Sequence, residues 1–225
     1  MSLILGIDTS TSSGSVALLK EGQLIGSQLY SIEKSHSSLL HVLIRQMMDN
    51  ASCTMDQLSG VAVAEGPGSY TGLRIGVSAA KGLCFALDIP LIAINTLEAM
   101  AYQLFRRSVD IKFYCPMLDA RRMEVYAALF DDRFENVRPT SPVILEEYAF
   151  EDVLADNKIL FFGDGSNKSE QIITHRNAHF VKNIVPSAEE VALLALDKFK
   201  NQKFENVVSF EPFYLKEFRT ASSFK

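Results

Sequence analysis

The chain has 225 residues, of which 48% are hydrophobic, and carries a formal net charge of −5. This length and apolar content suit one large domain or two small ones with a substantial core. The acidic balance argues against a protein that binds nucleic acid through its own overall field.

Cysteine usage and hydropathy indicate the compartment. Three widely spaced cysteines without a C-x-x-C pair argue against a disulfide scaffold and against structural zinc. No basic stretch with a following apolar run opens the chain, and no apolar run is long enough to span a bilayer. We therefore expect a cytoplasmic protein that is not bound to a membrane.

The first half of the chain predicts the element order βββαβαβα. Short apolar runs separated by turn residues predict strands, and apolar residues at the helical period predict helices. The expected elements are strands at 3–8, 14–19 and 23–30, a helix at 35–49, a strand at 61–64, a helix at 72–86, a strand at 91–94 and a helix at 96–107.

The second half repeats this order, so we expect an internally duplicated α/β protein with subdomains 1–107 and 108–225. Duplicated βββαβαβα units are the plan of the actin-like, Hsp70-like and sugar-kinase folds, which share a ribonuclease H-like core. The expected elements are strands at 111–118, 123–130 and 134–144, a helix at 146–155, a strand at 159–162, a helix at 166–174, a strand at 178–181 and a helix at 188–200.

Each unit has one aspartate at the end of its first strand. It is Asp8 in the first unit and Asp119 in the second. In the actin-like plan this turn faces a nucleotide phosphate. Asp8 offers a carboxylate for a metal-bound water, while Thr9 and Ser10 offer hydroxyls for phosphate oxygens. The alternative is a hairpin turn whose polar side chains bond to nearby backbone groups. The sequence leaves both interpretations open.

A glycine-rich loop joins the strand at 61–64 to the helix at 72–86, and it contains Gly66, Gly68 and Gly72. Glycine permits a close backbone approach and a positive φ, and the start of a helix favours an anion. The loop therefore predicts either phosphate binding or very tight packing. Gly163 and Gly165 form a weaker counterpart in the second half.

The histidines and cysteines do not predict an active site. His36 and His41 are five residues apart, which places them about 140° apart around a helix. His175 and His179 have helical spacing but enter a strand. No cysteine has an evident basic partner, and no G-x-S-x-G motif accompanies the serines. We expect no catalytic residue and no metal site.

Several segments together are similar to the TsaB family, which helps install threonylcarbamoyl on the adenosine beside the anticodon of certain tRNAs. They follow one another in order between residues 3 and 215. The matching segments are Ile7–Ser10, His36-Ser37 with Leu39-Leu40, Gly66–Arg74, Asn95–Glu98, Asp119–Arg121 with Glu124–Tyr126, Gly163–Gly165, and Glu211-Pro212 with Tyr214-Leu215.

The resemblance implies a non-catalytic paralogue and obligatory partner of the catalytic subunit TsaD. It implies a complex with TsaD and the ATPase TsaE, which reaches tRNA only through that complex, while TsaC supplies the threonylcarbamoyl-adenylate. TsaD holds its metal with a His-x-x-x-His helix, and Thr96 and Met100 stand in the matching positions here. A hydroxyl and a thioether do not replace two imidazoles. ATP or ADP in a vestigial cleft, and self-association without TsaD, remain open.

The helix at 72–86 is apolar nearly all round, and the helix at 35–49 has a broad apolar arc. Taken alone, each pattern is typical of a core helix covered by the rest of the chain. The resemblance implies instead that these helices form the partner surface. We expect a salt bridge from Arg74 to Glu65 or Glu98, with a ligand contact as the alternative. The residues expected to contact the partner are His36, Leu39, Leu40, Leu43, Met47, Gly72, Gly76, Ala79, Ala80 and Leu83.

Two other function classes compete with this interpretation. One is an independent kinase or ATPase of the actin-like superfamily, in which Asp8 and Asp119 hold a magnesium nucleotide. The other is a metalloprotease, and the missing histidine pair argues against it.

Overall fold

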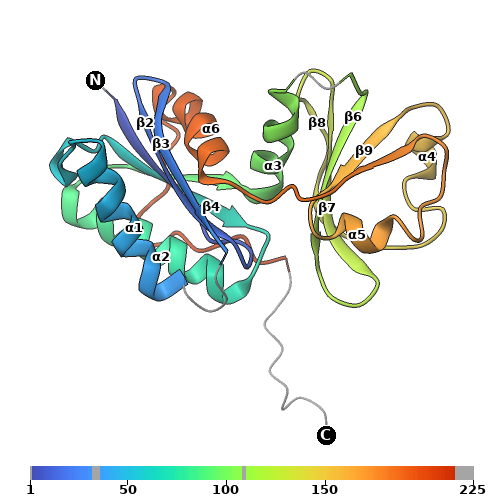
Figure 1. Cartoon of the computed structure of the whole chain (residues 1–225), viewed down its shortest axis with the longest axis horizontal. Helices are drawn as coiled ribbons and strands as arrows, with labels where there is room; N and C mark the ends of the chain where they lie inside the picture. The colour runs from blue at the N-terminus through green and yellow to red at the C-terminus, as the bar shows by residue number, and fades with distance from the viewer. Residues whose placement is uncertain (1, 32–35, 108–109, 216–225) are drawn as a thin grey trace, which may run out of the picture.

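The structure is a computed structural model that describes residues 2–31, 36–107 and 110–215 (Figure 1). The first half contains β1 (Leu3–Asp8), β2 (Gly14–Lys20), β3 (Gln23–Tyr30), α1 (His36–Asn50), a 3-10 helix (Met55–Gln57), β4 (Gly60–Gly66), α2 (Tyr70–Leu87), β5 (Leu91–Asn95) and α3 (Thr96–Phe105). The second half contains β6 (Phe113–Asp119), β7 (Glu124–Asp131), β8 (Asn136–Ile144), α4 (Glu151–Leu154), β9 (Ile159–Phe162), α5 (Ser166–Ser169), β10 (Ala178–Val181) and α6 (Ala188–Lys200).

The two sheets have the same topology. The strand order is β3-β2-β1-β4-β5 in the first sheet and β10-β9-β6-β7-β8 in the second. β1 is antiparallel to β2 and parallel to β4, as β6 is antiparallel to β7 and parallel to β9. The predicted duplication of a βββαβαβα unit is therefore confirmed.

Side-chain caps fix the starts of the three helices nearest the candidate sites. The Ser69 hydroxyl accepts a hydrogen bond from the Gly72 N–H at the start of α2. The Asn95 side chain caps α3 and the Ser187 side chain caps α6 in the same way. These caps satisfy N–H groups that have no partner inside the helix.

The helices cover the sheets unequally. α1 and α2 pack on one face of the first sheet, where Leu40 and Ile44 join Leu5 and Ile7 in a buried core. α6 covers the other face of the same sheet. In Figure 1, α3 and α6 lie between the two sheets.

The predicted subdomain limits stay a prediction, but α3 and α6 each pack on the sheet of the other half. Leu97, Met100 and Leu104 of α3 pack with Tyr114 and other residues of the second sheet. α6 comes from the second half of the chain, yet its apolar face packs on the first sheet. Periodicity identifies the apolar face of a helix but not the sheet that receives it. Residues 108–109, at the predicted boundary, lie outside the described residues.

Two predicted helices are shorter than expected. The helix expected at 146–155 is reduced to α4, since Phe150 immediately before it has a left-handed φ of 67°. The helix expected at 166–174 is reduced to the four residues of α5, Ser-Asn-Lys-Ser, which are mostly weak helix formers.

After α6 the chain returns to the first half as a segment of turns and irregular structure, residues 205–214, that we call the C-terminal strap. The Glu205 N–H donates to the Leu91 carbonyl at 2.9 Å, and the Phe213 N–H donates to the Glu65 carbonyl at 2.8 Å. Between these points the Lys81 Nζ donates to the carbonyls of Val208 and Phe210 at 3.1 and 2.8 Å. The strap therefore lies along α2.

Across the described ranges, no helix combines the length and the apolar character needed to cross a bilayer.

Candidate functional site

The turn after β1 holds a fully buried carboxylate. Asp8 Oδ1 accepts hydrogen bonds from the Ser10 N–H at 2.9 Å and the Ser10 hydroxyl at 2.8 Å. Asp8 Oδ2 is buried without a hydrogen-bond partner among the described residues. Burial raises the pKa of Asp8 from its usual 3.8 to about 6; the two Ser10 bonds oppose this rise and the negative Glu190 adds to it. The end of β1 therefore buries a carboxyl group of which one oxygen has no hydrogen-bond partner among the described residues.

The matching turn after β6 is built in the opposite way. Asp119 Oδ1 accepts from the Lys168 Nζ at 2.8 Å and from the Arg121 N–H at 2.6 Å. Partial burial would raise the pKa of Asp119, but the bonds from Lys168 and Arg121 outweigh it and lower that pKa. Lys168 also donates to the carbonyls of Arg122 and Glu124. This carboxylate is already neutralised and is poorly suited to a magnesium ion.

The glycines of the first loop serve tight packing against the Asp8 turn. A Cβ on Gly68 would meet the Ser10 carbonyl oxygen, and one on Gly72 would meet the Thr9 carbonyl oxygen, both far inside normal contact. The Thr9 hydroxyl donates to the Gly72 carbonyl at 2.7 Å. Gly66 has a φ of +121°, and its Cβ would lie 2.9 Å from the Phe213 carbonyl oxygen of the strap. The loop is thus filled by the chain's own backbone.

The second glycine pair is packed in a similar way. Gly163 has a φ of +95°, and a Cβ there would meet the Met117 carbonyl oxygen. A Cβ on Gly165 would lie 2.9 Å from the Leu118 carbonyl carbon. Of the residues predicted to hold a nucleotide, Asp8, Thr9, Ser10, Gly66 and Gly68 gather in the first half, while Gly163 and Gly165 lie in the second. Close backbone packing therefore explains why glycine stands at these positions, and nucleotide binding by these residues stays a prediction.

The positions that match the TsaD histidines are packed in the interior. Thr96 and Met100 of α3 are both buried. The Met100 methyl would be only 2.7 Å from a Cβ on Gly163, so the thioether fills the space beside that glycine. In the described part of the chain, no three His, Cys, Asp or Glu side chains gather to hold a metal ion.

Two cysteines are deep in the cores. Burial raises the pKa of Cys84 to about 11 and raises the pKa of Cys115 further. Neither thiol is therefore disposed to act as a nucleophile near neutral pH.

Many residues predicted to contact a partner instead pack inside this chain. Leu40, Met47, Ala79 and Ala80 are buried in the first core. Gly72 and Gly76 face Thr9, whose Oγ1 would collide with a Cβ on Gly76. This corrects the assignment of those side chains. Leu39, Leu43 and Leu83 are half-buried, and the side chain of His36, at the start of α1, lies outside the described residues.

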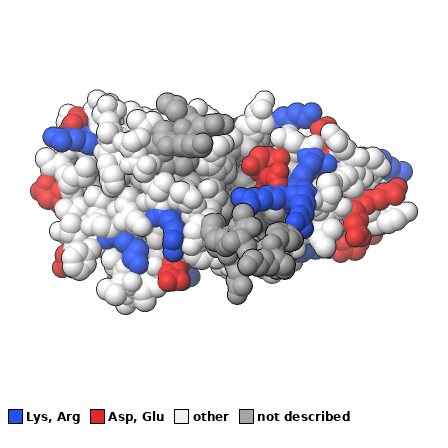
Figure 2. All heavy atoms as spheres, turned by 90° about the horizontal axis from the view of Figure 1, so that it is seen from below, with Lys and Arg blue, Asp and Glu red and all other residues white. Residues whose placement is uncertain are grey.

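The outer face of the same two helices exposes other residues. Phe85 of α2 is 79% exposed and Val42 of α1 is 48% exposed. Ser78, Gly82 and Ala86 are exposed at a spacing of four, and nothing lies within 4 Å of a Cβ on Gly82. Figure 2 shows scattered basic and acidic groups among uncharged residues on the first half, whereas basic and acidic groups lie side by side on the second half. The small residues at 78, 82 and 86 lie four apart in the sequence, and this spacing alone could have identified the exposed row on α2.

Arg74 does not make the predicted ion pair. Its guanidinium lies over the Tyr70 ring, 4.7 Å from the centroid, and the Tyr70 ring contacts the Tyr214 ring at 5.0 Å. Burial raises the pKa of both Glu65 and Glu98, and the nearby cation that opposes this rise is Lys198 of α6. A helix crossing from the other half thus supplies the charge that local sequence assigned to Arg74.

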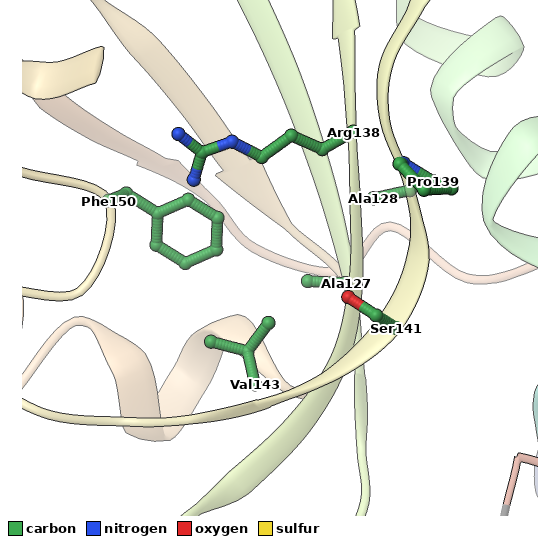
Figure 3. A pocket seen from close by; sticks show the side chains of 7 residues that line it. All are labelled: Ala127, Ala128, Arg138, Pro139, Ser141, Val143 and Phe150. Carbon is green, nitrogen blue, oxygen red and sulfur yellow. The ribbon is translucent and has the colours of Figure 1, made fainter. Parts of the chain in front are cut away.

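A pocket of about 140 Å³ opens on the second sheet beside β7 and β8 (Figure 3). The Arg138 guanidinium extends from β8 over the Phe150 ring, 5.8 Å from its centroid, and pairs with Asp152. The lining residues are Ala127, Ala128, Arg138, Pro139, Ser141, Val143 and Phe150.

Known proteins match this architecture. The family described as TsaD, tRNA N6-adenosine threonylcarbamoyltransferase, matches residues 30–222. A tRNA threonylcarbamoyladenosine biosynthesis protein TsaB from Bacillus subtilis is 35% identical over 173 residues, which cover 76% of this chain and 74% of the relative.

Solved structures agree with this match. A Pseudomonas aeruginosa protein described as similar to the peptidase YEAZ has a TM-score of 0.85 and 28% identity, over 96% of this chain and 100% of that one. The ADPNP-bound activator of the 2-hydroxyisocaproyl-CoA dehydratase from Clostridium difficile shares only the actin-like fold, with a TM-score of 0.50 and 10% identity over 91% and 98% of the two chains. The chain therefore belongs to the TsaB family of tRNA threonylcarbamoyladenosine biosynthesis proteins.

Proposed function

We propose that this chain is a non-catalytic subunit of the machinery that makes threonylcarbamoyladenosine beside the tRNA anticodon. It binds and activates the catalytic TsaD subunit, together with the ATPase TsaE. The observation that supports this proposal is that Thr96 and Met100 are both buried in the core. The family resemblance implies that these two positions match the metal-binding histidines of TsaD. A family member without that site contributes by assembly, and tRNA reaches it through the complex because the chain itself is acidic.

The proposed TsaD contact is the outer face of α1 and α2. Phe85 and Val42 supply apolar anchors there, and the exposed row Ser78, Gly82 and Ala86 leaves room for a partner helix to approach. Interfaces draw most of their binding energy from a few large side chains in well-packed surroundings. An exposed phenylalanine beside small residues fits that pattern.

Reconstitution tests the central claim. TsaC, TsaD and TsaE from the same organism are incubated with tRNA, threonine, bicarbonate and ATP, with and without this chain, and modified adenosine is measured by mass spectrometry of the digested tRNA. We expect modification only when the chain is present. Full modification without it would overturn the proposed function.

Surface variants test the contact. Phe85→Asp places a charge in the centre of the proposed interface and should weaken TsaD binding at least about tenfold, measured by calorimetry. Val137→Asp is the matched control, because Val137 is 47% exposed on β8 of the other sheet. Equal loss in both variants would mean that the effect is not specific to the helices. Sedimentation of the chain alone would show whether the same face supports self-association.

One observation favours a second candidate, an independent ATPase. Asp8 keeps a buried oxygen without a partner at the turn where actin-like proteins bind nucleotide. Two observations weigh against it: Asp119 is already paired with Lys168, and the glycine loop packs closely against the chain's own backbone. ATP hydrolysis by the purified chain, lost in Asp8→Ala, would favour this candidate over the assembly role.

A further inference from the structure

An irregular stretch of β8 opens the edge of the second sheet. The register of β7 and β8 shifts between Ala127 and Leu129, where two residues of β8 lie opposite a single residue of β7. One of the two is Pro139, which has no N–H to donate to the ladder. Such a β-bulge interrupts the pairing and redirects side chains of the bulged strand. Ala127 and Ala128 have small side chains, so a pocket of about 140 Å³ lies open at the bulge.

The lining of this pocket combines one cation with apolar walls. Figure 3 shows the Arg138 side chain extending toward the Phe150 ring, and its guanidinium lies 5.8 Å from the ring centroid. Val143 and the two alanines supply further apolar surface, while Ser141 adds one hydroxyl. Among the described lining residues, Arg138 is the one that carries a charge. The lining therefore suits a ligand with an apolar body and a single negative charge.

A carboxylate of the chain already binds this guanidinium. Arg138 pairs with Asp152 of α4, whose side chain is 67% exposed, while that of Arg138 is 38% exposed. The bond to Asp152 comes from Nη2, and a guanidinium has further N–H groups to offer a second acceptor. Exposed ion pairs are weak, and arginine binds carboxylates in a planar, two-bond geometry. A carboxylate of a ligand can therefore share the guanidinium with Asp152 or replace it.

The volume of the pocket sets the size of the ligand. An engineered cavity of about 150 Å³ binds benzene, so a pocket of about 140 Å³ has room for a body of similar size. We propose that this pocket is a binding site for a small monocarboxylate whose apolar body is about as large as a benzene ring. The body packs against Phe150 and Val143, and the carboxylate bonds Arg138. The site is independent of the TsaD contact proposed on α1 and α2, because it lies on the other sheet.

Titration of the full chain with benzoate tests the site. Benzamide is the uncharged counterpart of the same size, and acetate is an anion without the ring. Binding is followed by the NMR shifts of the backbone amides that line the pocket, such as those of Ala127, Ala128 and Val143. We expect saturable binding of benzoate with a dissociation constant on the order of 1 mM. Benzamide and acetate should each bind at least about tenfold more weakly, since one lacks the charge and the other the apolar body.

Three variants separate the guanidinium from other effects. Arg138→Gln should weaken benzoate binding about tenfold or more, because a hydrogen bond between charged groups is lost. Asp152→Asn removes the competing carboxylate and should strengthen binding about two- to fivefold. Arg45→Gln is the matched control, because Arg45 is exposed on α1 of the first half, and it should change the affinity by less than about twofold.

The opposite signs of two effects give the sharpest outcome. A weaker Arg138→Gln together with a stronger Asp152→Asn would support the site, since general damage to the fold would weaken binding in both. Three results would each overturn the proposal: no saturable shifts with benzoate in the wild type and in Asp152→Asn, equal affinity for benzamide and benzoate, or wild-type affinity in Arg138→Gln. Shifts spread over the arginines of both halves would mean unspecific anion binding and would overturn it too.

Discussion

The two halves place an aspartate at the same point of the same strand and treat it in opposite ways. Asp8 is buried with an unsatisfied oxygen and a raised pKa, whereas Asp119 is half-exposed, paired with Lys168 and has a lowered pKa. A duplicated backbone thus keeps its topology while the chemistry at equivalent positions diverges. Burial thus favours the neutral acid at Asp8, whereas the ion pair with Lys168 favours the ionised carboxylate at Asp119.

The helices diverge as well. One face of the first sheet is covered by α1 and α2, of 15 and 18 residues. The second sheet has α3 on one face and only α4 and α5, of four residues each, on the other. Short helices leave β7 and β8 partly uncovered, and the pocket of Figure 3 opens there. The two halves therefore share a strand order but differ in the length of the helices that cover it.

The largest expected change in the free energy of unfolding comes from removing the acid at Asp8, which tests the contrast between the two aspartates. Asp8→Asn keeps an acceptor for Ser10 and removes the buried charge. For Asp8, the rise in pKa from 3.8 to about 6 corresponds to about 3 kcal/mol. Because the folded pKa is raised, the stability that the acid contributes is complete below about pH 4 and is lost as the pH rises through about 6. Asp8→Asn should therefore raise the free energy of unfolding near neutral pH and change it little at pH 4. Urea titrations at both pH values check this, and an equal effect at both would contradict it.

The next effect tests the packing of the glycine loop. Gly72→Ala pushes a methyl group into the Thr9 carbonyl oxygen and should destabilise the protein by about 1–3 kcal/mol. Gly82→Ala, ten residues later on the same helix, meets nothing and should stabilise it by about 0.5–1 kcal/mol. Thermal unfolding of both variants provides the comparison. A stable Gly72→Ala protein would mean that this loop does not need close approach.

A smaller effect concerns the second aspartate. Asp119→Asn removes the ion pair to Lys168, and at this exposure we expect a loss of about 0.2–1 kcal/mol at neutral pH. The folded pKa is lowered here, so that stability is present above the usual pKa of 3.8 and is lost as the pH falls through the folded value. The difference in the free energy of unfolding between the wild type and Asp119→Asn should therefore vanish in acid. For Asp8→Asn the difference should also be largest near neutral pH, but with the opposite sign. A gain at neutral pH would refute the assignment.

The smallest effect concerns the uncovered sheet. Ser141→Val adds apolar volume and a β-branched side chain on β8 beside the pocket, and should stabilise the fold by about 0.5 kcal/mol. Thermal unfolding measures it, with Ser27→Val on β3 of the covered first sheet as the control. Equal shifts would show that strand propensity, rather than the pocket, is responsible.

Much of the fold could be predicted because each strand is a short apolar run between turn residues. β1, β3, β9, β10 and α6 begin and end where the sequence predicts. The packing of α3 on the second sheet and of α6 on the first could not be predicted, because the apolar face of a helix does not indicate which sheet it will contact. The same limit misassigned Leu40, Gly72 and Gly76: their small or apolar character was recognised, but Thr9 and the first sheet, rather than a partner, take up those faces.

The crossing of α3 and α6 has a consequence for how the chain can be divided. A cut between residues 107 and 110 yields fragments that each lack a helix needed to cover a sheet face, because α6 packs on the first sheet and α3 on the second. Neither fragment should fold alone, yet the two should complement each other when they are produced together.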